Sequence, residues 1–263
     1  MIDLLIEPGT WRGFLTLWGA LYLVLLSIYF GLGSILVLIS KLHPERQIQT
    51  VKRSSRDLKD ILQSLVALIS ISFYVSFGIF AQASGWTLLA AVDTTVLSFI
   101  AFLVLSFLLY DTWFYWGHRA LHTPLLYRFH ELHHRSITPT TWSNNNDSFV
   151  GATIEQGYFL VLPFVLPVPP EVIIVHKLYD QVTGMISHCG FEYFAGKGAR
   201  APWPGLCTVF HDQHHSNFRC NYGNTFSLWD RLCGTMHPKY DDRVLYFENV
   251  STKDKGAESV VSK

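Results

Sequence analysis

An uncharged apolar run near the N-terminus constrains the fold more than any other feature. Residues Phe14 to Ser40 contain no Asp, Glu, Lys or Arg and consist mainly of large aliphatic and aromatic residues. The hydrocarbon core of a bilayer is about 30 Å thick and is crossed by roughly 20 apolar residues in helical form. The run therefore predicts a transmembrane helix.

Four further runs extend this prediction. Ile61–Gln82 and Trp86–Tyr110 are strongly apolar, the second interrupted only by Asp93, whereas Ser148–Val168 and Glu171–Ser187 are weaker. The weaker pair predicts a hairpin that either spans the membrane or re-enters it. Charged residues make up 15% of the chain, against about a quarter in an average soluble domain. We expect an all-α integral membrane protein with about four transmembrane helices.

The charges in the loops predict an orientation. The loop Lys41–Asp60 holds six basic residues, and the short loop near Gly85 holds none. Lys and Arg concentrate in cytoplasmic loops, so the basic loop is predicted to be cytoplasmic. Counting crossings from there returns the chain to the cytoplasm at about Asp111, and the hairpin goes out and back. A net charge of +0 gives no electrostatic attraction to nucleic acid.

Histidines cluster in the cytoplasmic parts of this topology. The patch HRALH begins at residue 118, HELHH at 130, and HDQHH at 211, and a single histidine lies in SHCGFE. Residues three and four apart share one face of a helix. The candidate metal ligands are His118, His122, His130, His133, His134, His188, His211, His214 and His215. The other histidines stand alone and are not included.

So many imidazoles in one place indicate metal ions. Without metal, packed imidazoles would leave buried nitrogens unpaired, at a cost of about 1–3 kcal/mol for each unsatisfied group. One tetrahedral zinc takes about four ligands, so nine imidazoles suit two ions with open positions. Two open, redox-active ions beside a membrane favour activation of O₂, although imidazole itself does not exclude zinc.

Asp111 is a candidate supporting residue for this site. Asp111, Tyr115, His118 and His122 follow one helical stripe in the sequence DTWFYWGHRALH. A carboxylate often accepts the outward N–H of a metal-bound imidazole. The alternative is a solvated carboxylate at a helix end.

The second patch also matches a protease motif. HELHH contains H-E-x-x-H, in which His130 and His134 would bind zinc and Glu131 would act as the general base. This alternative predicts an intramembrane metalloprotease, but it leaves the other patches without a role. A metal transporter is a further alternative, and it should place its ligands near the bilayer midplane.

The order H-x-x-x-H, H-x-x-H-H, H-x-x-H-H, interleaved with apolar spans, resembles the fatty acid hydroxylase / sterol desaturase superfamily of membrane di-iron oxygenases. The resemblance covers roughly Asp111 to Thr235. The segment HDQHHSNFRCNYGNTFSLWDRLCGT is most similar to that of sterol hydroxylases. A His-Pro pair that many members carry before the fourth span is replaced here by NNNDSFVGATIE.

The resemblance implies a fold and an activity. It implies membrane spans over residues 1–110, a catalytic domain over 111–250 that includes the hairpin 148–187, and a cytoplasmic helical cap carrying a histidine-rich dimetal site. Polar composition predicts a disordered tail at 251–263. The nine histidines would hold two non-haem Fe ions.

The implied reaction is hydroxylation of an unactivated C–H bond of a lipid, sterol-like in kind, with O₂. Electrons would come from a separate cytochrome b5-like or ferredoxin-type donor. Desaturation of the lipid or sterol is the alternative at the same site. The implied membrane is the endoplasmic reticulum in a eukaryote or the inner membrane in a bacterium.

Overall fold

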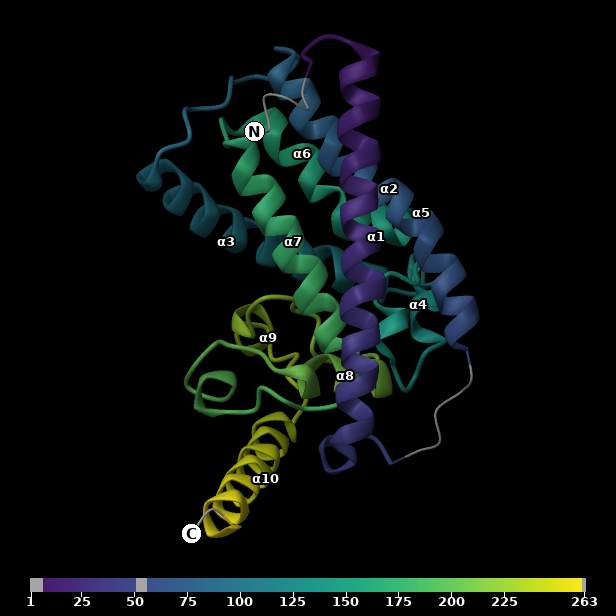
Figure 1. The fold of residues 1–263 in the computed structure, drawn as a ribbon, viewed down its shortest axis with the longest axis vertical. Coiled ribbons are helices and arrows are strands. Elements are labelled where there is room, and N and C mark those ends of the chain that lie inside the picture. The colour runs from purple at the N-terminus through teal and green to yellow at the C-terminus, as the bar shows by residue number, and fades with distance from the viewer. Residues whose placement is uncertain (1–6, 51–55, 262–263) are drawn as a thin grey trace.

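The computed structural model describes the backbone of residues 7–50 and 56–261, and side chains as far as residue 250. The described part is mostly helical, and within it no strand forms (Figure 1). The helices are α1 Trp11–Leu42, α2 Asp57–Ala83, α3 Val96–Leu121, α4 Glu131–His134, α5 Phe149–Gln156, α6 Tyr158–Val165, α7 Pro170–Ser187, α8 Thr208–Ser216, α9 Leu228–Leu232 and α10 Tyr240–Val261.

Three of these helices, α1, α2 and α3, are long and apolar enough to cross a membrane. α3 leaves large apolar side chains in the open, with Val96 79% and Leu97 80% exposed, and α1 does so at Leu23 and Leu38. Exposed apolar faces of this extent mark contact with lipid or another apolar surface. The protein is therefore an integral membrane protein, and a fourth span remains a prediction.

The third helix begins later than its sequence predicted. Trp86–Tyr110 was expected to span, but residues 86–95 are not helical and α3 starts at Val96. Thr95 Oγ1 accepts from the Ser98 N–H at 3.1 Å and Ser98 Oγ accepts from the Thr95 N–H at 2.9 Å. This capping box fixes the helix start. The helix then runs past Tyr110 to Leu121, carrying the first histidine patch.

The predicted hairpin is broken into three helices. α5 and α6 are separated at Gly157, and together they form a shorter apolar segment, Phe149–Val165. α7 starts at Pro170, where the ring suits the first helical position. In α7, Lys177 Nζ and Asp180 Oδ2 form a buried ion pair at 2.7 Å.

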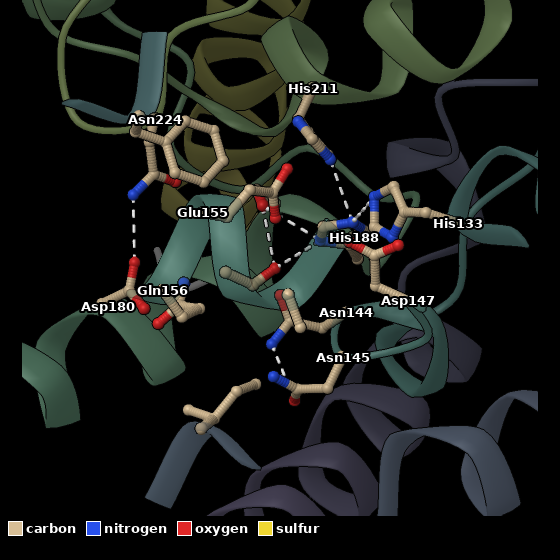
Figure 2. Close-up of a pocket in the computed structure, with 15 residues that line it drawn as sticks. His133, Asn144, Asn145, Asp147, Glu155, Gln156, Asp180, His188, His211 and Asn224 are labelled. Carbon is tan, nitrogen blue, oxygen red and sulfur yellow. Dashed lines mark hydrogen bonds between the residues drawn. The ribbon is translucent and has the colours of Figure 1, made fainter. Parts of the chain in front are cut away.

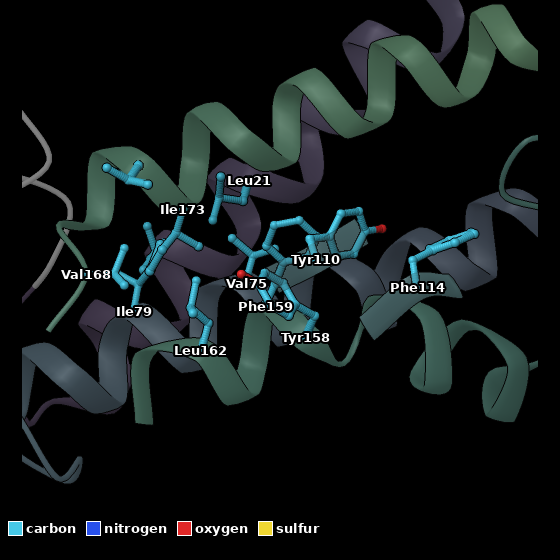
Figure 3. Packing of buried hydrophobic residues seen from close by; sticks show 12 residues of the cluster. Leu21, Val75, Ile79, Tyr110, Phe114, Tyr158, Phe159, Leu162, Val168 and Ile173 are labelled. Atoms are coloured by element: carbon cyan, nitrogen blue, oxygen red, sulfur yellow. The ribbon is translucent and has the colours of Figure 1, made fainter. Parts of the chain in front are cut away.

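One apolar core holds α1, α2, α3, α6 and α7 together. Figure 3 shows Leu21, Val75, Tyr110, Phe159 and Ile173 converging from these helices, all of them buried. Because the core joins α3 and α7 to the other candidate spans α1 and α2, it fixes where the C-terminal ends of α3 and α7 lie.

The basic loop lies beside the histidine-rich region. The Ile48 N–H donates to the Gly190 carbonyl at 3.1 Å, and the Glu192 N–H donates to the Arg46 carbonyl at 2.9 Å. Gln49 Nε2 donates to Asp212 Oδ1 in α8 at 2.9 Å. Lys52 and Arg53 of this loop lie outside the described residues. The basic loop and the histidine-rich region are therefore at the same end of the helices.

The last helix, α10, runs from Tyr240 to Val261. Lys, Glu and Asp residues without proline permit a helix to continue. The disordered tail expected over 251–263 stays a prediction.

Candidate metal centre

Four separate segments carry the nine candidate histidines to one end of the helical bundle. His118 lies in the last turn of α3, and His122 is the residue that caps this helix. His188 caps α7 in the same way. The second patch lies on and just before α4, and the third lies on α8. Eight of the nine side chains are buried, and His122 is partly exposed.

The nine imidazoles form two groups. His118, His122, His130, His134 and His214 make up the five-histidine cluster, and His133, His188, His211 and His215 make up the four-histidine cluster. Within each cluster, one nitrogen of every ring lies within 4.8 Å of the corresponding nitrogens of the others. Ring nitrogens at such separations can bind a common ion.

The patches divide between the clusters in a regular way. In HELHH, His130 and His134 join the five-histidine cluster and His133 joins the other. In HDQHH, His211 and His215 join the four-histidine cluster and His214 joins the other. Each patch therefore gives its i, i+4 pair to one cluster and its middle histidine to the second. The sequence predicted that the histidines of each patch point in one direction. It did not predict that each patch divides between the two clusters.

Nε2 atoms meet at the centre of each cluster. In the five-histidine cluster, His134 Nε2 lies 3.1 Å from both His122 Nε2 and His214 Nε2. In the four-histidine cluster, His188 Nε2 lies 3.2 Å from His133 Nε2 and 2.9 Å from His211 Nε2 (Figure 2). Pairs of ring nitrogens thus face each other at close range.

Backbone carbonyls determine which nitrogen carries the proton. A carbonyl oxygen can only accept, so a ring nitrogen bonded to it is the N–H of a neutral imidazole, and the other nitrogen keeps its lone pair. Four Nδ1 atoms donate in this way: His118 to Tyr222 at 2.9 Å, His133 to Asn146 at 3.3 Å, His188 to Gly184 at 2.8 Å and His214 to Cys220 at 2.7 Å.

Burial keeps these rings neutral. Removal from water lowers the pKa of His133 to about 4 and the pKa of His188 to about 3. Burial also lowers the pKa of His214 and His215 well below the usual range, and neighbouring imidazoles add to the effect. At neutral pH the inward Nε2 atoms therefore present lone pairs to one another.

This donor set fits metal ions. Lone pairs facing each other repel unless a cation lies between them. His118 Nε2 and both nitrogens of His130 are buried without a hydrogen-bond partner. A buried polar atom left unpaired is rare in native proteins, and a bound ion would satisfy these nitrogens. Neutral imidazole is a common ligand for iron, zinc, copper and nickel.

Asp111 takes a different partner from the one expected. Its Oδ1 accepts from the backbone N–H of Thr225 at 3.1 Å and of Phe226 at 2.9 Å, and from no imidazole among the described hydrogen bonds. At 1.5 Å per residue, Asp111 lies roughly 10 Å before His118 along α3. It shares the stripe but is too far along the helix, so it anchors the segment that follows the third patch.

Glu131 does not face the cluster. Its side chain is 53% exposed and pairs with Arg135 at 3.3 Å on the surface. A general base must lie within hydrogen-bond reach of the reacting group. The H-E-x-x-H match therefore lacks the geometry of a metalloprotease.

Several residues that support the site carry no signal in the sequence. Asp230 accepts from the N–H of Tyr222 at 2.9 Å and of Gly223 at 2.7 Å, and so holds the carbonyl that His118 uses. A Cβ on Gly223 would overlap the Phe226 carbonyl. Backbone acceptors have no characteristic residue type, so spacing rules for ligands cannot find them.

A small cavity borders the four-histidine cluster. It has a volume of about 50 Å³, and Figure 2 shows His133, His188 and His211 on one side of it. Polar side chains make up much of the rest of its lining, among them Asn144, Asn145, Asp147, Glu155, Gln156, Asp180 and Asn224. The cavity therefore connects the cluster with a buried polar region.

Comparison with known proteins places the chain in a family. It is similar to a probable Delta(7)-sterol 5(6)-desaturase of Neurospora crassa, with 28% identity over 73% of this chain and 56% of that protein. It is also similar to a cholesterol 25-hydroxylase-like protein of Danio rerio (32% identity, 49% of this chain and 53% of that protein). For lathosterol oxidase of Mus musculus the identity is 33%, covering 51% of this chain and 45% of that protein.

The chain spans about half the length of the curated relatives it matches. No solved structure matches it significantly. The model of the fatty acid hydroxylase family matches residues 103–235, which is half of the chain and includes all nine clustered histidines. The protein belongs to the fatty acid hydroxylase family.

Proposed function

We propose that this protein is a membrane-bound non-haem di-iron oxygenase that hydroxylates an unactivated C–H bond of a sterol-like lipid. The reaction consumes O₂, two electrons and two protons and yields the alcohol and water. The observation that carries the proposal is the convergence of Nε2 lone pairs in two adjacent histidine clusters. One Fe would be held by the five-histidine cluster and the second by the four-histidine cluster.

The bound irons would supply the reduction of O₂, and the chain's own residues would hold and orient the ligands. The carbonyls of Tyr222, Asn146, Gly184 and Cys220 fix four ring orientations before any ion arrives. Holding reacting groups in register is a large part of what a protein contributes to cofactor chemistry. The catalytic domain is proposed to be 111–250.

Two cavities that share wall residues support a lipid substrate. The cavity of about 50 Å³ beside His188 has room for a molecule the size of O₂ or water but not for a lipid. A second cavity of about 230 Å³ is lined by Tyr179, Ile186, Phe194 and Leu206, among others. Both cavities include Ser187 and Asn224 in their walls. We infer that the lipid lies in the larger cavity and presents its reacting carbon through this shared boundary.

The relatives support the substrate class. Several are named for sterols, including the cholesterol 25-hydroxylase-like protein and a putative methylsterol monooxygenase of Dictyostelium discoideum. These names describe those proteins, and a sterol-like substrate for this chain is the proposal drawn from them.

Desaturation is the second candidate, and a specific observation favours it. Three relatives are named Delta(7)-sterol 5(6)-desaturases. A desaturase would use the same site, remove two hydrogen atoms from neighbouring carbons, and release both oxygen atoms of O₂ as water.

The position of the site supports a topology and a class of partner. The clusters lie at the same end of the helices as the basic loop, which is predicted to be cytoplasmic. We propose that the site faces the cytoplasm, where a separate cytochrome b5-like or ferredoxin-type protein delivers electrons. The proposed membrane is the endoplasmic reticulum in a eukaryote or the inner membrane in a bacterium.

Isotope labelling tests the proposal directly. Membranes that contain the protein are incubated with ¹⁸O₂, a reduced electron donor and a sterol-containing lipid extract, and products are identified by mass spectrometry. An ¹⁸O-labelled alcohol that the His211→Ala variant does not form is expected. An unlabelled alkene would favour desaturation. Iron-loaded protein that gives neither product would contradict both candidates.

A further inference from the structure

His130 differs from the other candidate ligands in its surroundings. The ring is 0% exposed, and neither of its nitrogens has a hydrogen-bond partner. Four other rings turn Nδ1 toward a neutral backbone carbonyl. His130 Nδ1 instead faces two carboxylates, with Asp147 Oδ2 at 3.5 Å and Glu155 Oε1 at 3.9 Å. These distances exceed a hydrogen bond but are close enough for one to form after a small movement.

Asp147 is held in place for such a contact. It is 5% exposed, and its Oδ1 accepts from the Ser148 N–H at 2.7 Å. Its Oδ2, the atom nearest His130, is buried and has no hydrogen-bond partner. Ser148 begins α5 by accepting from the Gly151 N–H at 3.0 Å. A Cβ on Gly151 would overlap the Asp147 carboxylate, so the glycine leaves the space that this carboxylate occupies.

Glu155 reaches the same point from the last turn of α5. Its side chain is 15% exposed. Figure 2 shows Asp147 and Glu155 lining the cavity that also borders His133 and His188. The two carboxylates thus both lie within 4 Å of His130 Nδ1.

We propose that Asp147 and Glu155 are positioning residues that accept the Nδ1–H of His130 and direct its Nε2 lone pair into the five-histidine cluster. This inference rests on the proposed metal centre. An ion bound at Nε2 places the ring proton on Nδ1, where it needs an acceptor. The closest described acceptors are these two carboxylates, and the unpaired Asp147 Oδ2 lacks a donor. The imidazole and the carboxylate thus each supply the hydrogen-bond partner that the other lacks.

The arrangement also makes the two clusters electrically different. A carboxylate behind a liganding imidazole makes that imidazole a stronger donor than a neutral carbonyl does. In the four-histidine cluster, His133 and His188 have only carbonyl partners at Nδ1 apart from the neighbouring Ser187 hydroxyl. The five-histidine cluster therefore has the greater donor strength and favours the more positive ion.

Metal binding to purified full-length protein tests this inference. The double variant Asp147→Asn/Glu155→Gln keeps side-chain size but removes both carboxyl groups. Gly151→Ala keeps both carboxyl groups but displaces Asp147. Glu248→Gln is the matched control, because Glu248 is partly buried like Glu155 but pairs with Arg200 at 3.1 Å rather than facing an imidazole. Unfolding of each metal-free variant checks that it folds.

The readout is Co²⁺ affinity by chelator competition, together with the absorption spectrum of each Co²⁺-loaded protein. Loss of supporting carboxylates typically weakens metal binding by about 10- to 100-fold. We expect that loss for one of two ions in the double variant and in Gly151→Ala, with an altered spectrum. We expect wild-type behaviour in Glu248→Gln.

Three outcomes would contradict different claims. Unchanged affinity and spectrum in the folded double variant would overturn the role of Asp147 and Glu155. Three ions in the wild-type protein, with the third lost in the double variant, would overturn it by making His130, Asp147 and Glu155 a separate site. Wild-type protein without a pair of bound ions would instead contradict the proposed function.

Discussion

At the scale of single residues, the site depends on ring nitrogens whose proton positions are fixed by their outward partners. His214 illustrates this, because its Nδ1–H is held by the Cys220 carbonyl and its Nε2 lies 3.1 Å from His134 Nε2. A side chain without an imidazole at this position cannot supply the lone pair. The proposed ligand role of each histidine therefore depends on which ring nitrogen keeps its lone pair.

His214→Ala should lower bound metal from about two ions per chain toward one and abolish product formation, because it removes one of the five imidazoles proposed to hold one of the ions. Metal content by mass spectrometry and product analysis check this. His43→Ala is the control, since His43 is 53% exposed and belongs to neither cluster. Two retained ions and full activity in His214→Ala would remove the third patch from the site.

A substitution at Asp111 distinguishes a structural role of this residue from a role in supporting a metal ligand. Asp111→Ala leaves the N–H groups of Thr225 and Phe226 without their acceptor. Each buried group left unpaired costs about 1–3 kcal/mol, so the variant should unfold at a lower temperature in detergent. Its metal content should stay near that of the wild type. Loss of metal from a variant of undiminished stability would show that Asp111 supports a ligand after all.

At the scale of elements, helices locate the histidines more exactly than loops do. The C-terminal turn of α3 and the end of α7 supply His118 and His188. The third patch lies on α8 and the second on and just before the short α4. The segment that follows α4 packs closely against α1 at Gly33. The Trp142 ring lies against Gly33, and the Trp142 carbonyl accepts from Tyr29 Oη at 2.7 Å.

Gly33→Val should therefore destabilise the protein by about 1–3 kcal/mol, the usual cost of overpacking a buried site. Gly31→Val, two residues away on the same helix, is the control because a Cβ there meets nothing within 4 Å. Chemical unfolding of both variants in detergent provides the comparison. Equal stability of the pair would show that the Trp142 contact is dispensable.

Sequence patterns predicted the elements unequally, for physical reasons. The apolar runs at Phe14 and Ile61 predicted α1 and α2 closely because lipid-facing helices need continuous apolar length. The start of α3 was placed ten residues early, since hydropathy does not register the capping box at Thr95. Histidine spacing predicted that the nine rings gather at one site. It did not predict how the patches divide between the two clusters, or that Asp230 holds the segment whose carbonyl binds His118, because both depend on tertiary contacts.

At the scale of the whole molecule, the long helices bring the basic loop and the clusters to one end. Residues 46–49 bond to the segment after His188 and to Asp212. The exposed segment around Ala90 follows α2, whose first turn lies near the basic loop. A span through α2 therefore separates the two regions by the membrane.

Cysteine labelling in sealed vesicles tests this topology. Glu45→Cys and Arg135→Cys should react with a membrane-impermeant maleimide from the same side, and Ala90→Cys from the other, because α2 crosses the membrane between them. The native cysteines Cys189, Cys207 and Cys220 are buried, and the partly exposed Cys233 is replaced by Ser in every variant to keep the background low. Reaction of Glu45→Cys and Arg135→Cys from opposite sides would contradict the shared location of loop and site.

The division of each three-histidine patch between the two clusters has a geometric consequence. His133 and His134 are chain neighbours, as are His214 and His215, and each pair contributes to both clusters. Neighbouring Cα atoms are held about 3.8 Å apart by one trans peptide. The distance between ions held by the two clusters would thereby be tied to covalent geometry at two points, so neither cluster can shift without moving the other.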